Sequence, residues 1–302
     1  MQTSPQIIQS ALQSLRAEQP ALRMRDIAQR LGISEATLVA SACGSHTGTI
    51  RLTPDPAAQF AALGTLGRVM ALTRNSGAVI EKIGVYGPVE QGGHASQVLG
   101  PDIDLRIFFH RFHVGFAVTA QGPRGPQRSL QFFDARGDAV HKVHLQPDSD
   151  LAAFDQLVDR FASTDQSPHQ PLVPTTASPS ADTPKDPNLA DADVDVTALR
   201  TAFSQMQDTH EFFALLRRFS LRRTQALRLL GPQAARPVDR LALHPLLHAA
   251  AESALPIMVF VGSPAVIQIH SGAIATVKQL GPWLNILDPG FNLHVDQGAL
   301  AH

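Results

Sequence analysis

Apolar residues recur at helical spacing between residues 207 and 223. Asp208 is placed to cap the first turn, and Glu211, three residues later, to complete a capping box. One side of the predicted helix would face a core and carries Phe212, Leu215, Leu216 and Phe219. Another side carries His210, Phe213 and Arg217, so an imidazole, an aromatic ring and a cation share one surface.

Alternating patterns predict β-hairpins at two places. Residues 69–84 and 257–272 each contain two β-type runs around a polar turn. Each is followed by a proline turn and an alternating strand, at residues 98–109 and 286–296. Both halves place helices before strands in the same order. The simplest interpretation is an α+β fold built from two copies of one unit, each with N-terminal helices and an antiparallel sheet.

The second copy is predicted to be incomplete. The first half continues through a hairpin that turns at Arg136 and Gly137 and a helix at residues 151–163, whereas the chain ends at His302, just past the equivalent strand. Residues 163–196 are rich in Pro, Ser, Thr and Asp and almost free of large apolar side chains, which predicts a flexible linker. We expect an N-terminal repeat at 1–162, a linker at 163–196 and an incomplete C-terminal repeat at 197–302.

Composition narrows the class of protein. A chain of 302 residues exceeds one average domain, and a net charge of −1 gives no basic footprint for nucleic acid. The single cysteine, Cys43, cannot form an intrachain disulfide. The sequence contains no run of about 18 consecutive apolar residues. It therefore predicts a cytoplasmic protein that is not embedded in a membrane.

Residues 24–44, from Met24 to Gly44, also fit a helix-turn-helix. A glycine turn would join two helices, the second of which could enter a DNA major groove. That second helix carries Glu35 but no Arg or Lys to neutralise phosphates. A DNA-binding regulator is therefore kept as the alternative function.

The 13 histidines are poorly spaced for a metal site. His141 and His144, like His110 and His113, lie three apart in strand-like segments and should point to opposite faces. His244 and His248 lie four apart on a predicted helix, but no third ligand is near them in the sequence. We expect packed or solvated histidines rather than a zinc site.

Two stretches together resemble a known family. QDTHEFFALLRRFSLRR, from Gln207, and PWLNILDPGFNLH, from Pro282, are similar to the bacterial hemin-degrading and hemin-transport proteins of the HemS/HmuS/ChuS type. The resemblance covers nearly the whole chain. Members of the family normally carry several tens more residues at this end, so the chain resembles a C-terminally shortened member.

The resemblance implies roles for particular residues. His210 matches the histidine that ligates heme iron, and Arg106, in the strand sequence Ile103-Asp104-Leu105-Arg106, matches a distal arginine that would act in catalysis. Arg223 matches an arginine that pairs with a heme propionate, although the neighbouring Arg222 fits nearly as well. Phe213 and Arg217 are assigned from the helix face that they share with His210, where the ring could stack on a porphyrin and the cation could pair with a propionate. Without the resemblance, we would interpret His210 as a surface residue and Arg106 as a surface cation beside carboxylates.

The family also implies a function with heme as the bound cofactor. The chain would serve heme-iron acquisition in the cytoplasm, either opening the porphyrin ring with oxygen and a reductant or carrying heme to a heme oxygenase. An inner-membrane heme transporter is the other expected partner. The sequence departs from the family at Leu280-Gly281-Pro282, where relatives carry a lysine, and at Ile80, where some relatives carry a second heme-binding histidine.

Overall fold

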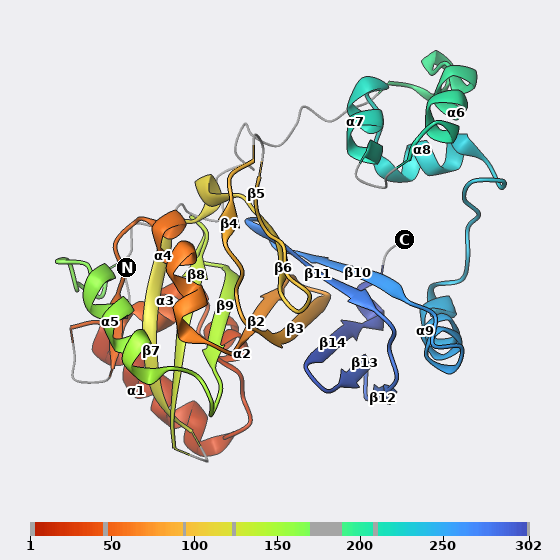
Figure 1. The fold of residues 1–302 in the computed structure, drawn as a ribbon. Helices are drawn as coiled ribbons and strands as arrows, with labels where there is room; N and C mark the ends of the chain where they lie inside the picture. Colours follow the sequence, from red (N-terminus) through yellow and green to blue (C-terminus); the bar gives the residue numbers. More distant parts are fainter. Residues whose placement is uncertain are drawn as a thin grey trace. The chain divides into compact units, whose positions relative to one another are not determined.

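The computed structural model describes residues 4–44, 48–92, 95–122, 125–169, 189–207 and 211–300 (Figure 1). The chain forms two compact units. The first contains Met1–Pro174 and His244–Ala299, and the second contains Thr175–Leu243 and Leu300–His302. We call them the sheet unit and the helical unit. The described residues include no helix that is both long and apolar enough to cross a membrane.

The sheet unit is built on a large and a small antiparallel sheet (Figure 1). The large sheet has the strand order β1 (Thr49–Arg51), β7 (Val114–Gly122), β8 (Gly125–Phe133), β9 (Ala139–Leu145), β2 (Val69–Arg74), β3 (Ala78–Gly84), β14 (Phe291–Asp296), β13 (Trp283–Asp288) and β12 (Val277–Leu280). The small sheet has the order β10 (Ile257–Gly262), β11 (Val266–Gly272), β6 (Asp104–Ile107), β5 (Ser96–Val98) and β4 (Val89–Glu90).

Helices cover both faces of the large sheet. Those of the sheet unit are α1 (Pro5–Glu18), α2 (Met24–Arg30), α3 (Glu35–Ala40), α4 (Pro56–Ala62), α5 (Leu151–Phe161) and α9 (Leu243–Glu252), with 3-10 turns at Leu63–Leu66, Phe109–Arg111 and Gln297–Ala299. Side-chain oxygens of Ser34, Asp55 and Asp150 cap α3, α4 and α5 by accepting from amides of the first turn. On one face α3 packs on Phe116 and Phe133.

The main core lies on the opposite face of the large sheet, against α4, α5 and the small sheet. Phe60 stands at its centre, with its ring centroid 5.1 Å from that of Phe132 and 5.4 Å from that of Phe112. Alternation along β8 produces this arrangement, because Leu130 and Phe132 point into the core. The intervening residues of β8 point toward α1–α3.

The two predicted hairpins form, and each pairs with strands from the other end of the chain. Residues 69–84 are β2–β3 and residues 257–272 are β10–β11. Val79 of β3 lies opposite His294 of β14, and Ile267 of β11 lies opposite Arg106 of β6. Ile267 lies 188 residues after Val79, and His294 lies 188 residues after Arg106, so the two pairs are counterparts of each other. The same separation relates Lys82 to His270, whose Nζ and Nδ1 atoms lie 3.3 Å apart.

The helical unit contains α6 (Val196–Ser204), α7 (Glu211–Arg218) and α8 (Arg223–Leu230), with 3-10 turns at Asp191–Asp193 and Arg240–Ala242. Its core includes Leu199, Leu215, Leu216 and Leu230. Phe212 and Phe219 pack against this core, as the helical spacing predicted. The cap predicted at Asp208 lies outside the described residues.

The predicted mixed α+β class is confirmed. The boundaries of the compact units differ from those of the predicted repeats at 1–162 and 197–302, because β11 and β14 hydrogen bond with β6 and β3 of the first half. The helix predicted at residues 151–163 is α5. Most of the predicted linker, residues 170–188, lies outside the described residues.

Candidate functional site

Arg106 lies on the outward face of β6. Strand alternation directs Leu105 and Ile107 into the core, where they are buried, and leaves Asp104 and Arg106 on the other side. Arg106 Nη1 donates to Asp104 Oδ1 and, at 3.2 Å, to the carbonyl oxygen of Leu105. A guanidinium has five N–H donors, and both of these bonds leave from one nitrogen.

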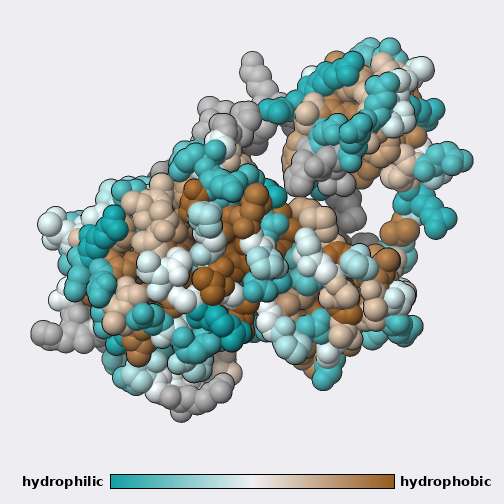
Figure 2. Space-filling model, viewed as in Figure 1, coloured by the Kyte–Doolittle hydropathy of each residue, from teal (hydrophilic) through white to brown (hydrophobic). Residues whose placement is uncertain are grey.

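An apolar surface surrounds this guanidinium. Ile267 of β11 and Gln97 of β5 lie directly opposite Arg106 in the sheet. Phe260 and Met258 of β10 project from the same side and are 49% and 51% exposed. Figure 2 shows hydrophobic colour over the region of β4–β6 in Figure 1. We call Arg106, Asp104, Ile267, Phe260 and Met258 the Arg106 face.

The Arg106 face suits a flat apolar ligand that carries an acceptor. Exposed aromatic and aliphatic side chains attract an apolar ring, since large exposed apolar groups mark binding surfaces. The guanidinium beside them supplies charged donors, held in place along the strand by Asp104.

The helical unit brings two other predicted site residues together. Phe213 is 56% exposed on α7, and the guanidinium carbon of Arg223 lies 5.2 Å from its ring centroid. Arg217 is exposed one helical turn beyond Phe213. His210 lies outside the described residues. Next to it, Glu211 Oε1 accepts from the backbone amide of Gln207 at 3.3 Å.

The predicted site residues are divided between the two units. Arg106 belongs to the sheet unit, whereas Phe213, Arg217 and Arg223 belong to the helical unit. The positions of the units relative to one another are not determined, so the five predicted roles stay predictions.

The predicted helix-turn-helix forms, but its second helix is buried. Gly32 adopts φ +65 between α2 and α3, a left-handed turn that suits glycine. Within α3, Ala36, Leu38 and Ala40 have no exposed surface, and Glu35 pairs with Lys142 and Arg74. A helix packed in this way cannot enter a major groove, so the DNA-binding alternative has no support.

The two histidines of β9 point to opposite faces, as their spacing predicted. His141 is buried in the core, 2.8 Å from Thr73 Oγ1 and 2.6 Å from Tyr86 Oη. Burial lowers its pKa from 6.5 to about 3, so the imidazole is neutral at pH 7. His144 points toward α1–α3. Within the part of the chain that the structure describes, no three metal-ligating side chains gather into a site.

Sequence reasoning missed a cavity between α1–α3 and the large sheet. It has a volume of about 920 Å³, and its lining includes Ser129, Gln131, Lys142 and His144. Polar residues that alternate with core residues along β8 and β9 are the sequence signal that could have shown a polar face here.

The comparisons with known proteins agree with the resemblance. A family model described as the haemin-degrading HemS.ChuX domain matches residues 32–161 and 220–302. The chain is 38% identical over 290 residues to the hemin transport protein HmuS of Yersinia pestis, a match that covers 95% of this chain and 80% of that protein.

Solved structures give the same result. The crystal structure of holo-PhuS, a heme-binding protein from Pseudomonas aeruginosa, aligns with a TM-score of 0.89 and 45% identity over 99% of this chain and 84% of that one. The heme degrading enzyme ChuS of Escherichia coli O157:H7 aligns with a TM-score of 0.84 and 31% identity over 98% of this chain and 84% of that one. The chain belongs to the haemin-degrading HemS/ChuX family.

Proposed function

We propose that this chain binds heme and serves heme-iron acquisition. The observation that carries the proposal is the Arg106 face, where a guanidinium stands among exposed apolar side chains on a strand that the family model matches. Heme has the matching chemistry, since it combines a flat apolar ring with an iron that takes an axial ligand and with two carboxylates.

His210 is the proposed axial ligand of the iron. A neutral imidazole is a common donor to heme iron, and His210 directly precedes α7 in the sequence. Phe213 would stack on the porphyrin, while Arg217 and Arg223 would pair with propionates. The contact between the Arg223 guanidinium and the Phe213 ring supports this assignment, because it places a cation and an aromatic surface side by side.

Arg106 is the proposed distal residue. Asp104 orients its guanidinium, and the N–H groups of Nη2 and Nε extend the donor set beyond the two bonds made by Nη1. Bound heme would supply the redox chemistry of its iron, while this arginine would stabilise negative charge on the open side of the ring.

Heme binding would serve ring opening or delivery. The relatives carry names of both kinds, a hemin transport protein and a heme degrading enzyme. A heme oxygenase and an inner-membrane heme transporter are the proposed partners for delivery. We also propose a cytoplasmic location, since Cys43 is the single cysteine of the chain and is a free thiol.

We further propose that the two halves are copies of one unit that have exchanged strands. The β2–β3 hairpin continues into β14–β13–β12, and the β10–β11 hairpin continues into β6–β5–β4. The equivalent residues of the two halves, such as Val79 and Ile267 or Arg106 and His294, are always 188 positions apart, which supports this interpretation. In it, residues 1–162 and 197–302 are the copies, the second incomplete, and residues 163–196 join them.

A hemin titration of the His210→Ala variant tests the proposed function. The unaltered protein should give a saturable, shifted Soret band, and His210→Ala should weaken binding about tenfold or more because the axial bond is lost. His244→Ala, which alters a histidine of α9, should leave the titration unchanged. Equal spectra for His210→Ala and the unaltered protein would remove His210 from the site.

A further inference from the structure

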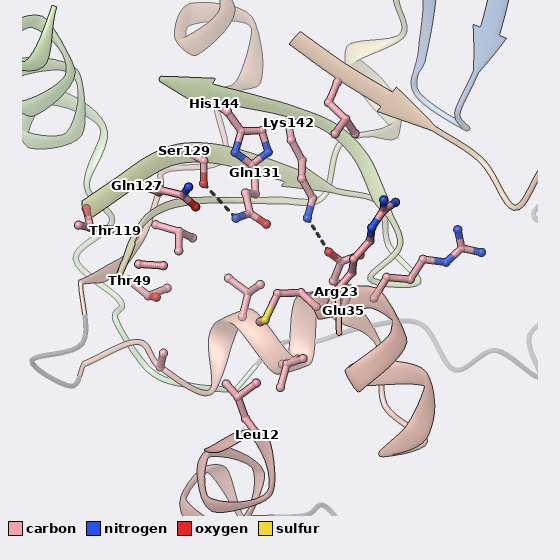
Figure 3. Close-up of a pocket in the computed structure, with 18 of the residues that line it drawn as sticks. Leu12, Arg23, Glu35, Thr49, Thr119, Gln127, Ser129, Gln131, Lys142 and His144 are labelled. Carbon is pink, nitrogen blue, oxygen red and sulfur yellow. Dashed lines mark hydrogen bonds and ion pairs between the residues drawn. The ribbon is translucent and has the colours of Figure 1, made fainter. Parts of the chain in front are cut away.

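The cavity between the large sheet and α1–α3 lies entirely within the sheet unit. Its volume of about 920 Å³ is that of a pocket for an organic molecule rather than of a packing defect. In Figure 3 the side chains of Ser129, Gln131, Lys142 and His144 extend from the strands toward the helices. None of the residues proposed to bind heme lines it.

The part of the cavity floor that β8 and β9 form is polar, because core and polar residues alternate along these strands. Ser129 lies opposite His144, and Gln131 lies opposite Lys142, so the four side chains form two adjacent cross-strand pairs. Burial and the nearby charge of Lys142 lower the pKa of His144 to about 4, so this imidazole is neutral at pH 7. The floor therefore presents an amide, a hydroxyl, a neutral imidazole and one ammonium group.

Gln131 has an unsatisfied acceptor. Its side chain is 7% exposed, and its Nε2 donates to Ser129 Oγ at 3.0 Å. Its Oε1 is buried and accepts no hydrogen bond from any described residue. In Figure 3 this oxygen is directed toward the open space between sheet and helices. Native proteins rarely leave a buried carbonyl oxygen unpaired, so the position is suited to an N–H or O–H group of a ligand.

The cavity also carries excess positive charge. Lys142 Nζ lies 2.5 Å from Glu35 Oε1, and Arg74 pairs with the other oxygen of the same carboxylate. One buried cation, Lys142, and one partly exposed cation, Arg74, thus share one anion. Three further arginines line the cavity, at positions 16, 23 and 25, and the second lining carboxylate is that of Glu81. Five cations against two carboxylates favour an anionic ligand.

The wall opposite the floor is apolar. It is formed by Leu12 of α1 and by Leu38 and Val39 of α3, with Met24 of α2 beside them. Met70 of β2, opposite His144 in the sheet, adds an apolar side chain to the floor. These side chains would cover an aromatic or aliphatic body. Because Gln131 and Lys142 are cross-strand neighbours, the ligand's acid group and its hydrogen-bond donor should lie only about 5 Å apart.

We propose that this cavity is a second ligand site and that it binds an amphipathic organic anion. The acid group lies at Lys142 and Arg74, an adjacent N–H or O–H donates to Gln131 Oε1, and the apolar body lies against Leu38 and Val39. The site is independent of the proposed heme site, because the two share no residue.

The probe 8-anilinonaphthalene-1-sulfonate has the required chemistry, with a sulfonate beside an anilino N–H on an aromatic body. The chain has five methionines, which makes methyl-labelled methionine a reporter of position. Met24 and Met70 line the cavity, Met258 lies on the Arg106 face, and Met206 packs in the helical unit. Titrating the full chain should shift the Met24 and Met70 methyl signals saturably. Shifts confined to Met258 or Met206, or no shifts, would overturn the proposal.

A pair of glutamine variants tests the contact with the probe. Gln131→Leu should raise the dissociation constant about tenfold, because the N–H of the probe loses its acceptor. Gln268→Leu is the matched control. Gln268 is also fully buried with an unpaired Oε1, but it donates to Ala71 and does not line the cavity. Equal affinities of the two variants for the probe would overturn the proposal.

A blocking variant keeps the test decisive if Gln131→Leu unfolds. Ala120 of β7 lines the cavity and is partly exposed, so Ala120→Trp fills the space without touching the ion pairs. The shifts at Met24 and Met70 should disappear in this variant, while its melting temperature stays near that of the unaltered protein. A folded Ala120→Trp protein that retains both shifts would overturn the proposal.

Discussion

The Arg106 face and the corresponding face of the large sheet have the same strand geometry, but their equivalent residues differ in exposure. Residues 188 positions before Met258, Phe260 and Ile267 are Met70, Leu72 and Val79, and the position 188 after Arg106 is His294. Phe260 and Met258 are half exposed, whereas Met70, Leu72 and Val79 line the cavity beneath α1–α3. Equivalent positions can therefore be half exposed in one sheet and line a cavity in the other.

The charged residues around the two faces are paired differently. On the Arg106 face, the cation is paired within its own strand, to Asp104, and needs no other element. On the counterpart face, Lys142 and Arg74 are paired to Glu35, which belongs to α3. The covering helix is thus bound to the sheet by ion pairs as well as by apolar packing.

Replacing Glu35 should weaken the attachment of α3 to the sheet, and we expect the largest loss of unfolding free energy from this change. Glu35→Ala leaves the buried Lys142 and the partly exposed Arg74 without their anion, which should cost about 3–5 kcal/mol of unfolding free energy in urea. Glu81→Ala, at the edge of the same face, removes one hydrogen bond to Asn292 and should cost about 1 kcal/mol. Similar losses in the two variants would show that α3 is not held by this cluster.

The Glu35 cluster should also weaken in acid. Burial raises the pKa of Glu35, but the charges of Lys142 and Arg74 outweigh burial and lower it below 4.5. A lowered carboxyl pKa contributes stability above its unfolded value, and that contribution is lost as the pH falls through the folded value.

Arg106 and His294 offer the most direct test of which face binds heme. Arg106→Ala should weaken hemin binding about 10–100-fold, since a charge-assisted hydrogen bond is worth about 1.5–3 kcal/mol. His294→Ala alters the equivalent position of the large sheet and should leave the affinity for hemin unchanged. Soret titrations of both variants provide the measurement. Equal losses of affinity for hemin in the two variants would show that heme does not bind preferentially to the Arg106 face.

Buried His141, in the core between the two sheets, should make the unfolding free energy depend on pH, with an effect of intermediate size. The pKa of His141 is lowered from 6.5 to about 3 by burial, so the unfolded chain takes up a proton that the folded chain does not. The contribution of His141 to stability should fall by about 2 kcal/mol between pH 6.5 and pH 5 and level off below pH 3. His144, whose pKa is lowered to about 4, adds to the loss over the same range. His141→Gln should therefore reduce the slope in thermal melts by about its own share, whereas His110→Gln, at an exposed histidine, should leave the slope unchanged.

Changes to the apolar side chains of the two faces should have the smallest effect on the affinity for hemin. Phe260→Ala removes a half-exposed ring from the Arg106 face and should weaken hemin binding about 5–10-fold through lost apolar contact. Leu72→Ala, at the equivalent position of the cavity, should leave hemin binding unchanged. A weaker affinity for hemin in Leu72→Ala would place heme on the other face.

Local features of the fold could be predicted from the sequence. Alternation within residues 69–84 and 257–272 identified both hairpins, and periodicity identified α5 and the buried side of α7. These patterns depend on neighbours in the chain. The pairing of β3 with β14 depends on residues about two hundred positions apart, for which a single sequence gives no register.

The candidate site was predictable to a similar degree. The family motifs identified Arg106 and Arg223, helical spacing identified Phe213 and Arg217, and the structure describes the surfaces on which they lie. The cavity was not predictable, because Glu35 looks like a surface residue until Lys142 and Arg74 are placed against it. Its floor comes from strands and its wall from helices that precede them by many residues.

The exchange of strands has a consequence for synthesis of the chain. When residues 69–84 leave the ribosome, β3 can pair with β2, but its other edge must wait for β14 at residues 291–296. At about 5–20 residues per second, that edge stays open for roughly 10–40 seconds. An unpaired strand edge is a template for aggregation. The architecture that joins the two ends of the chain in one sheet therefore leaves this edge of the nascent protein unpaired until the last described strand has been made.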